Sequence, residues 1–467
     1  MDITIDRSAK TPLAEQIRQR IAAAIDSGVL EPGTRLPSWQ DLAVQLGVSR
    51  GTVRSAYERL AAAQLIVASR SSGTQVAPRP RMQLKREPKP AAGSFLERYL
   101  EMTQGYGAFQ MGVPAADTLP KTLLARLRGH AVRAEVSAAP IYPDPRGELE
   151  LRRELAGYLA IARGIDCSPS QIIVTAGYSA GLGLTLRALG VEGEKAWIEE
   201  PGFPFTRRGL ELAHLTLVPV PVDEAGINVD YGLAHAADAR LVVVTPGQQA
   251  PLGSTLSLQR RLQLLDWATH NASWIIEDDY LSELQLNGRA APALASLDHG
   301  ERVIHIGSFS KTITPALRLG FIVVPIALTE TFSEVAACLA PPPGPAVQLA
   351  IARFMQEGHY LRHLRRTKRA YTGKRENLLR QLRRHVDPAQ LLTPGLAVLL
   401  QLPDNISDLN VTRQMAKSGM HPSPLSVWYA RADQTRAGLL LGVATAPVQG
   451  LDTVCEQLAR IINSDHR

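Results

Sequence analysis

Six short apolar runs alternate with stretches of helical periodicity in the middle of the chain, and this alternation limits the fold more than any other feature. The runs occupy residues 171–175, 196–199, 241–245, 274–277, 303–306 and 321–324. Strands that are covered on both faces are continuously apolar, and helices connect them when they run parallel. We therefore predict a mostly parallel sheet with helices on both faces and with ligands bound at the ends of its strands.

Length and charge indicate more than one domain. A chain of 467 residues is too long for a single core, so two or three domains are expected. Residues 1–90 carry 14 Lys or Arg against 8 Asp or Glu, whereas the remaining 377 residues carry 37 against 36. The excess of positive charge thus belongs to the N-terminal part, and much of it lies in a proline-rich segment that predicts an extended linker, residues 78–93.

The sequence shows neither a secretion signal nor an apolar run of about 18 residues. We expect a cytoplasmic protein with no membrane partner that is nucleoid-associated when bound to DNA. The three cysteines are far apart, without the paired spacing of a zinc site or a disulfide framework, so no metal is expected.

Residues 1–77 predict a winged helix-turn-helix, mainly helical with a β-wing. Leu13, Ile17, Ile21 and Ile25 recur every four residues, as on one face of a helix. Two further helices follow, capped by Ser38 and Ser49, and two short strands at 65–69 and 74–77 enclose a turn. The third helix leaves Arg50, Thr52 and Arg54 on its free side, where a recognition helix presents side chains to the major groove. A small helical bundle with solvated arginines is the alternative.

Polar side chains at strand ends predict a cofactor site. Gly177, Tyr178 and Ser179 open a helix, whose free amides could hold a phosphate. Asp278 ends a buried strand and needs a positive partner, which a pyridinium nitrogen would supply, and Tyr280 could donate to a ring hydroxyl. The alternative is that Glu277, Asp278 and Asp279 bind a divalent metal through oxygen ligands.

Lys311 argues against the metal. A lysine beside a phosphate site and a protonated ring is the group that forms a Schiff base with pyridoxal phosphate (PLP). Ser308 and Ser310 flank it with hydroxyls, and Arg318 offers a forked donor for phosphate oxygens. Taken alone, Lys311 would be interpreted as an ordinary surface lysine.

The N-terminal segment resembles the GntR family of bacterial regulators in the strings at 12–17, 33–38, 46–50, 52–53 and 56–60. The resemblance implies that Arg35 and the start of the third helix contact DNA. Gln40 and Ser71 stand where the family often has Arg and Gly, which bears on the operator sequence. The DNA-binding residues that we expect are Arg35, Ser38, Ser49, Arg50, Thr52, Arg54, Arg70 and Ser72.

Nearly the whole chain resembles the MocR subgroup of that family. The shared strings lie at 142–147, 151–152, 163–164, 171–172, 200–203, 222–224, 245–246, 277–280 and 308–311. The resemblance implies a PLP-binding aminotransferase-like fold of type I at 94–467, with a large subdomain at about 135–335 and a small α/β C-terminal subdomain at about 345–467.

The same resemblance assigns roles to individual residues. It implies Lys311 as the Schiff-base lysine, Asp278 at the ring nitrogen, Tyr280 at the ring hydroxyl and Phe203 stacked on the ring, although Phe203 in isolation would be interpreted as core. The phosphate would be held by Gly177, Tyr178, Ser179, Ser308, Ser310 and Arg318, with Tyr142 reaching in from a second subunit.

Two departures from aminotransferases bear on activity. Ala250 stands where those enzymes have an asparagine that contacts the ring. Leu440 stands where they, and the GABA-responsive member of the subgroup, carry an arginine that grips the substrate carboxylate. The loss of that charge-assisted pair predicts little transaminase turnover. Arg431 or Arg436 could compensate, but the sequence places both in a polar loop.

The sequence thus predicts a PLP-binding transcriptional regulator whose ligand changes operator affinity. A working aminotransferase with a DNA-binding appendage is one alternative, and a repressor that uses the fold only to dimerise is another. The expected partners are double-stranded operator DNA, PLP, an amino-compound effector, RNA polymerase and a second copy of the chain.

Overall fold

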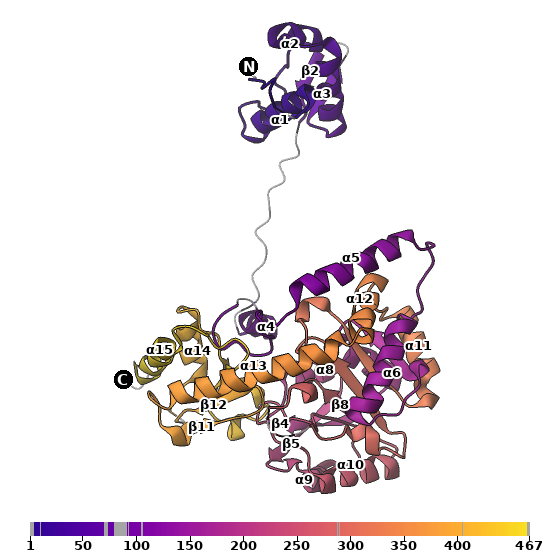
Figure 1. The fold of residues 1–467 in the computed structure, drawn as a ribbon, viewed down its shortest axis with the longest axis vertical. Helices are drawn as coiled ribbons and strands as arrows, with labels where there is room; N and C mark the ends of the chain where they lie inside the picture. The colour runs from indigo at the N-terminus through magenta and orange to yellow at the C-terminus, as the bar shows by residue number, and fades with distance from the viewer. Residues whose placement is uncertain are drawn as a thin grey trace. The chain divides into compact units, whose positions relative to one another are not determined.

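The computed structural model describes residues 4–9, 11–69, 73–78, 91, 93–103, 106–286, 288, 290–403 and 405–464. The chain divides into two compact units, Met1–Ser94 and Phe95–Arg467 (Figure 1). Each unit has its own apolar core.

The first unit is a helix-turn-helix followed by a two-stranded wing. Its helices are α1 (Leu13–Asp26), α2 (Trp39–Leu46) and α3 (Arg50–Ala62), and its strands are β1 (Ile66–Ser69) and β2 (Gly73–Val76). Ile17, Ile21 and Ile25 are the buried residues of α1, as their spacing predicts. The strands pair antiparallel, with Ser69 opposite Gly73. The predicted winged helix-turn-helix is confirmed.

The second unit contains an eight-stranded sheet in the order β3-β10-β9-β8-β7-β4-β5-β6. The strands are β3 (Ile172–Thr175), β4 (Lys195–Glu200), β5 (Thr216–Asp223), β6 (Gly226–Ile227), β7 (Leu241–Val244), β8 (Trp274–Asp279), β9 (Val303–Ser308) and β10 (Gly320–Val323). Neighbours from β9 to β5 run parallel, whereas β10 is antiparallel to both β3 and β9, and β6 is antiparallel to β5. The mostly parallel sheet is confirmed.

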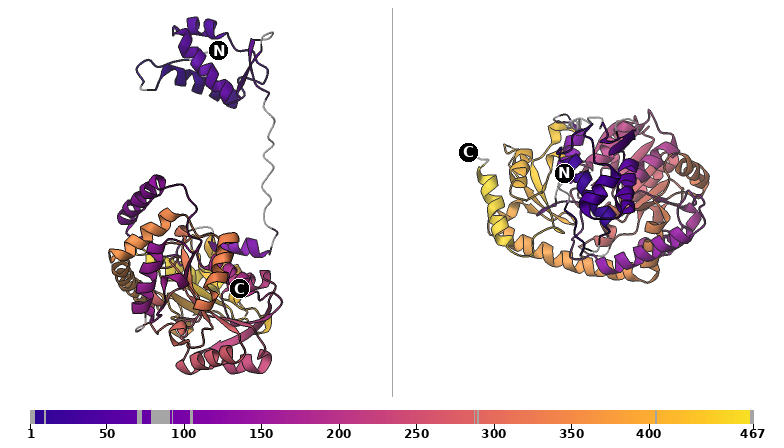
Figure 2. Two further views of the ribbon diagram at one scale, coloured as in Figure 1. Left: turned by 90° about the vertical axis from the view of Figure 1, so that its right-hand side faces the viewer. Right: turned by 90° about the horizontal axis from the view of Figure 1, so that it is seen from above.

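Helices cover both faces of this sheet, as Figures 1 and 2 show. They include α6 (Leu149–Arg163), α7 (Tyr178–Leu189), α8 (Pro204–Leu212), α9 (Val229–Ala236), α10 (Leu258–His270) and α11 (Thr329–Cys338). Successive side chains of a strand point to opposite faces. Accordingly, Ile276 packs in the core formed with α7, α8 and α11, while its neighbour Ile275 packs in the core formed with α9 and α10.

A smaller subdomain carries a four-stranded antiparallel sheet in the order β11-β12-β14-β13. Its strands are β11 (Leu391–Leu392), β12 (Ala397–Gln401), β13 (Ser423–Pro424) and β14 (Gly438–Gly442), and its helices are α14 (Asp408–Ala416) and α15 (Leu451–Ser464). The long helix α13 (His359–Leu382) follows α12 (Pro345–Gln356) and runs from the large sheet to this subdomain (Figure 1).

Two helices precede α6 in the second unit, α4 (Phe95–Thr103) and α5 (Lys121–Ser137). The helix α5 packs against α12. Among the described helices, none is both long and apolar enough to cross a bilayer.

Candidate functional site

The third helix presents two arginines at its free side. Arg50 and Arg54 are exposed and lie four residues apart, so both project from one face of α3. Arg54 forms an ion pair with Glu58 at 2.9 Å, with both side chains more than half exposed. An exposed pair of this kind contributes little to stability, so Arg54 remains free to turn toward a phosphate or a base.

Other residues expected at the DNA interface have a structural task in the first unit. The Ser38 hydroxyl accepts a hydrogen bond from the backbone N–H of Asp41 at 3.1 Å, and the Ser49 hydroxyl accepts one from that of Thr52 at 3.1 Å. Both serines therefore cap helices, as predicted. Arg35 lies beside Gly73 of the wing and forms a β-bridge with Gln75. Arg70 and Ser72 lie outside the described residues.

Sequence reasoning missed Arg7. Its guanidinium donates to the carbonyl oxygen of Gly47 at 2.8 Å and more weakly to that of Leu46, which fastens the N-terminal arm to the turn between α2 and α3. No periodic pattern includes this residue, because it precedes the first helix.

Asp278 lies inside β8, one residue before its end, and is buried. Its Oδ1 atom has no hydrogen-bond partner among the described groups. Burial, reinforced by the charges of Asp279 and Glu199, raises the pKa of Asp278 well above its ordinary value. A buried carboxylate with a free oxygen needs a donor or a cation, so the site is electrostatically incomplete as the protein alone.

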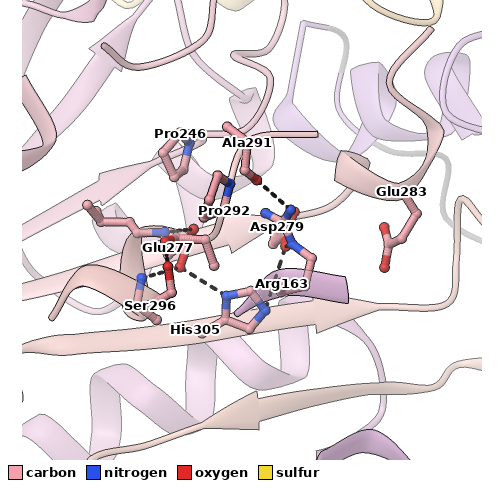
Figure 3. Close-up of polar contacts among 12 residues, drawn as sticks. Arg163, Pro246, Glu277, Asp279, Glu283, Ala291, Pro292, Ser296 and His305 are labelled. Atoms are coloured by element: carbon pink, nitrogen blue, oxygen red, sulfur yellow. Dashed lines mark hydrogen bonds and ion pairs between the residues drawn. The ribbon is translucent and has the colours of Figure 1, made fainter. Parts of the chain in front are cut away.

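Behind Asp278, a buried polar network fixes the end of β8 (Figure 3). Arg163 donates to Asp279 at 2.7 Å, and His305 Nδ1 lies 3.0 Å from Glu277. Glu277 also accepts the backbone N–H groups of Leu294 and Ala295. Because side chains alternate along a strand, Glu277 and Asp279 point to the face opposite Asp278. Although burial disfavours its charge, contact with Glu277 raises the pKa of His305.

A small cavity opens in front of Asp278. Its lining residues are Ile198, Glu199, Gly202, Phe203, Thr206, Arg207, Val243, Thr245 and Asp278. Two predicted site residues, Asp278 and Phe203, therefore meet at one cavity. Tyr178 joins it indirectly, because its hydroxyl lies 2.7 Å from that of Thr206.

Glu199, Thr206 and Arg207 line this cavity although sequence reasoning did not single them out. Burial raises the pKa of Glu199 to about 7, although the backbone N–H and hydroxyl of Thr245 donate to its carboxylate. Arg207 donates to the carbonyl oxygens of Val427 and Trp428, so it joins the large and small subdomains. The strand-end position of Glu199 was the only signal in the sequence.

Lys311 is half-buried and does not line the cavity. Its Nζ atom donates to the carbonyl oxygen of Gly112 at 2.6 Å. Gly112 has a φ of +76°, which favours glycine, and a Cβ atom there would lie 2.8 Å from the Lys311 nitrogen and would displace it. Burial lowers the pKa of Lys311 to about 8, with the charge of Asp278 acting in the opposite direction.

Anion-binding groups gather at the start of α7. Gly177 is the N-cap residue, with a φ of +88°, and the Arg318 guanidinium lies beside it, 3.8 Å from where a Cβ atom would stand. The hydroxyls of Ser308 and Ser310 are 2.9 Å apart. A helix start, an exposed arginine and paired hydroxyls together favour a phosphate.

The remaining predicted site residues are less closely placed. Ser179 is exposed on α7, and Tyr142 is fully exposed. Tyr280 is half-buried, and burial raises its pKa, while the Gln248 side chain acts in the opposite direction.

An apolar cluster of the core packs against Phe203. Ala250 and Leu440 are buried in one cluster with Leu399, Leu425 and Trp428, and Phe203 packs against that cluster. Leu440 lies in β14 with no exposed surface. Leu440 therefore supplies no cation to a bound carboxylate.

Comparisons with known proteins match both units. Residues 13–76 match the family model described as bacterial regulatory proteins of the gntR family, and residues 108–458 match aminotransferase class I and II. The probable rhizopine catabolism regulatory protein MocR of Rhizobium meliloti is 34% identical, over 95% of this chain and 92% of that protein. The pyridoxine biosynthesis regulator PdxR of Corynebacterium glutamicum is 34% identical, over 90% of this chain and 89% of that protein.

Solved structures match the second unit. The kynurenine aminotransferase of Pyrococcus horikoshii gives a TM-score of 0.71 at 22% identity, covering 82% of this chain and 96% of its own. LysN, the alpha-aminoadipate aminotransferase of Thermus thermophilus, gives 0.70 at 24% identity, covering 79% and 95%. At these identities the likeness establishes the fold alone.

Proposed function

We propose that this chain, which belongs to the MocR subgroup of the GntR family of bacterial regulators, couples a PLP-dependent ligand site in its aminotransferase-like unit to DNA binding by its first unit. That the chain is a DNA-binding transcriptional regulator follows from the family. The ligand and the coupling are the proposal. The observation that carries it is the buried, unpartnered oxygen of Asp278 at a cavity near Lys311.

The residues present fit PLP. A protonated ring nitrogen would supply the donor that Asp278 Oδ1 lacks. Arg318 and the start of α7 would hold the phosphate together with Gly177, Tyr178, Ser179, Ser308 and Ser310. When bound, PLP supplies an aldehyde that combines with an amine and a ring that withdraws electrons.

The protein's own groups would orient this ligand. Phe203, at the cavity, would stack on the ring, and Tyr280 would donate to the ring hydroxyl. The depressed pKa of Lys311 keeps part of its amine neutral near pH 7, which a nucleophile requires. Tyr142 is free to reach the site of a second copy, which is why we infer a homodimer.

The site favours retention of a ligand over turnover. With Leu440 and Ala250 in an apolar cluster, a substrate carboxylate would lack the bidentate cation that aminotransferases place at the position of Leu440. We therefore infer little or no transaminase activity. The effector would be PLP itself or an amino compound that combines with it. The name of the relative PdxR, which refers to pyridoxine biosynthesis, supports PLP as the signal.

The helix that follows the linker offers a route from the ligand to the first unit. Phe95 and Tyr99 of α4 contact Phe205, with ring centroids 5.6 and 5.0 Å apart. Phe205 in turn lies 5.0 Å from Phe203 at the cavity. A ring stacked on Phe203 would shift this aromatic chain and so favour one setting of α4 over another. RNA polymerase, in the cytoplasm, would be the partner whose transcription responds to the regulator bound at the operator.

The experiment is a comparison of operator affinity with and without PLP. The operator is first located by mapping the bound DNA genome-wide, and the Kd is then measured by fluorescence anisotropy. We expect PLP to change the Kd of the native protein by about 5- to 150-fold, the usual range of allosteric coupling, and to leave that of Lys311→Ala unchanged. Equal Kd values for the native protein in both conditions would refute the proposed coupling.

A further inference from the structure

The helix α13 and the two residues after it concentrate the positive charge of the second unit. Residues 359–384 contain ten Lys or Arg and one Glu. The rest of the chain after residue 90 has 27 Lys or Arg and 35 Asp or Glu. The part of the unit outside α13 therefore carries a net negative charge. The positive charge of the unit is thus specific to this helix and the two residues after it.

The exposed arginines form one stripe. At about 100° per residue, Arg362, Arg365, Arg366, Arg369, Arg380 and Arg383 fall within an arc of about 100°. The buried residues of the helix, among them Tyr360, Leu364, Tyr371 and Leu378, point the opposite way. From position 362 to 383 the stripe is about 32 Å long, and Figure 2 shows α13 along the outer edge of the second unit.

Some charges along the helix are already engaged. Lys374 pairs with Asp117 at 3.1 Å, and Arg384 pairs with Asp452 at 3.0 Å. Arg362 donates to His359 and to the carbonyl oxygen of Glu357, and Arg366 donates to the carbonyl oxygen of Thr118. Glu376 is the one acidic residue of the helix itself.

Four arginines of the stripe remain. Within the described parts of the chain, the side chains of Arg365, Arg369, Arg380 and Arg383 form no hydrogen bond or ion pair. Arg365 and Arg369 also stand at positions i and i+4, where like charges destabilise a helix by a few tenths of a kcal/mol. By the same geometry Glu376 lies within the arc, but it forms no ion pair with these four arginines in the described structure. One acid against this row leaves an excess of positive charge that a linear polyanion would balance.

We propose that the arginine stripe of α13 binds the phosphate backbone of double-stranded DNA flanking the operator, as a second contact beside the helix-turn-helix. The inference rests on operator binding by the first unit, which holds such DNA at high local concentration. A stripe of about 32 Å matches about one turn of B-DNA. The sixteen residues 78–93 can span at most about 55 Å, so flanking DNA within about 16 base pairs is in reach.

The test compares two duplexes, one limited to the operator footprint and one extended by about 30 base pairs of unrelated sequence on each side. The variant replaces the four unpaired arginines: Arg365→Gln, Arg369→Gln, Arg380→Gln and Arg383→Gln. Binding is measured by anisotropy over a series of salt concentrations. We expect unchanged binding to the short duplex. On the long duplex, the slope of log K against log salt should be less steep by about one unit for each phosphate that the variant no longer neutralises.

Two controls separate this contact from general charge and from misfolding. The first control removes the same amount of positive charge from other elements. It should keep the native slope on the long duplex, because its four exposed residues lie outside α13: Arg187→Gln, Lys195→Gln, Arg413→Gln and Arg460→Gln. In the second control the four stripe arginines are replaced by lysine, which should keep most of the native slope on the long duplex. The proposal is overturned if the four stripe Arg→Gln changes leave the slope on the long duplex unchanged. It is also overturned if the control with four charges removed from other elements makes the slope less steep by the same amount.

Two further outcomes are distinct. If the native protein fails to bind the short duplex, the operator binding on which the inference rests is itself refuted. If the stripe instead bound an acidic protein, all variants would keep the native slope on the long duplex, which contradicts the DNA contact.

Discussion

Lys311 and Asp278 lie where much of the water is excluded, and burial favours the neutral form of both. The pKa of Lys311 falls to about 8, and that of Asp278 rises. The Lys311 amine donates to the carbonyl oxygen of Gly112 and is close enough to Asp278 for the two charges to interact. A ligand with an aldehyde and a protonated ring would therefore find a reactive amine on Lys311 and, on Asp278, a carboxyl oxygen that can accept a hydrogen bond.

The state of Lys311 gives a prediction on pH. Its pKa lies below the ordinary 10.5, so the neutral amine becomes abundant at lower pH than in a surface lysine. The rate at which added PLP bonds to Lys311 should rise about tenfold per pH unit below pH 8 and level off above it. Stopped-flow absorbance of the protein and of Lys311→Ala measures this, and a rate that keeps rising to pH 10 would show an ordinary lysine.

The buried pair of Arg163 and Asp279 gives a prediction on stability. Arg163→Met would remove the guanidinium 2.7 Å from the Asp279 carboxylate, which is 4% exposed, and would leave His305 Nε2 at 3.8 Å as its neighbouring cation. Removing one partner of a buried pair costs about 3–5 kcal/mol. The double variant Arg163→Met with Asp279→Leu removes both charges. Its free energy of unfolding should fall by less than that of Arg163→Met alone. Urea unfolding followed by tryptophan fluorescence checks the order, and a double variant less stable than the single one would contradict it.

Individual residues could be predicted where a motif names them. Asp278, Lys311 and Phe203 stand in recognisable strings, and two of them line one cavity. Glu199 and Thr206 line the same cavity but belong to no such string, because only the packing of β4 and α8 brings them to Asp278. Residues that act through tertiary neighbours leave little trace in local sequence.

Among the elements, β5 and β10 were the hardest to predict. The alternating run of β5 contains Pro219 and Pro221, which argue against a strand. The strand forms because β4 pairs with it along one edge, while β6 pairs only with Val222 and Asp223 on the other, which leaves the prolines at a free edge. The apolar run of β10 was recognised, but its antiparallel direction depends on the connection from β9.

The helix α3 carries the prediction on DNA. Arg50 and Arg54 project from one face, so Arg50→Ala with Arg54→Ala should lower operator affinity by about 1–3 kcal/mol for each of the two arginines that binds a base, and should relax the specificity. Ser49→Ala is the contrasting change, because removal of the cap should destabilise α3 by about 1 kcal/mol. Footprinting with full affinity in the double arginine variant would refute the groove placement.

The helix α4 carries the prediction on coupling. Tyr99→Ala removes a ring 5.0 Å from Phe205, so the effect of PLP on operator Kd should shrink by at least half on a logarithmic scale. PLP binding and ligand-free operator affinity should stay unchanged. Tyr231→Ala, whose ring stacks on His235 instead, is the matched control. Full coupling in Tyr99→Ala would exclude this route.

The whole molecule joins a unit that binds DNA to a unit with the fold of an enzyme, and the proposed coupling requires that the ligand bind two arrangements unequally. Sequence predicted both folds, because each has its own periodic pattern and motifs. It could not predict the contacts of α4 with Phe205, on which the proposed coupling depends, since these are tertiary contacts within the second unit.

The turnover rate of the whole molecule distinguishes a regulator from an enzyme. A regulator benefits from a bound state that persists, whereas an enzyme must release its product. Leu440 has no exposed surface and packs with Ala250, so this position supplies no arginine to a substrate carboxylate. We expect negligible steady-state transamination in a coupled assay of 2-oxo acid formation across a panel of amino donors. Turnover in the usual enzyme range of about 1–1,000 per second would show instead that other groups, such as Arg207 at the cavity, supply the missing cation.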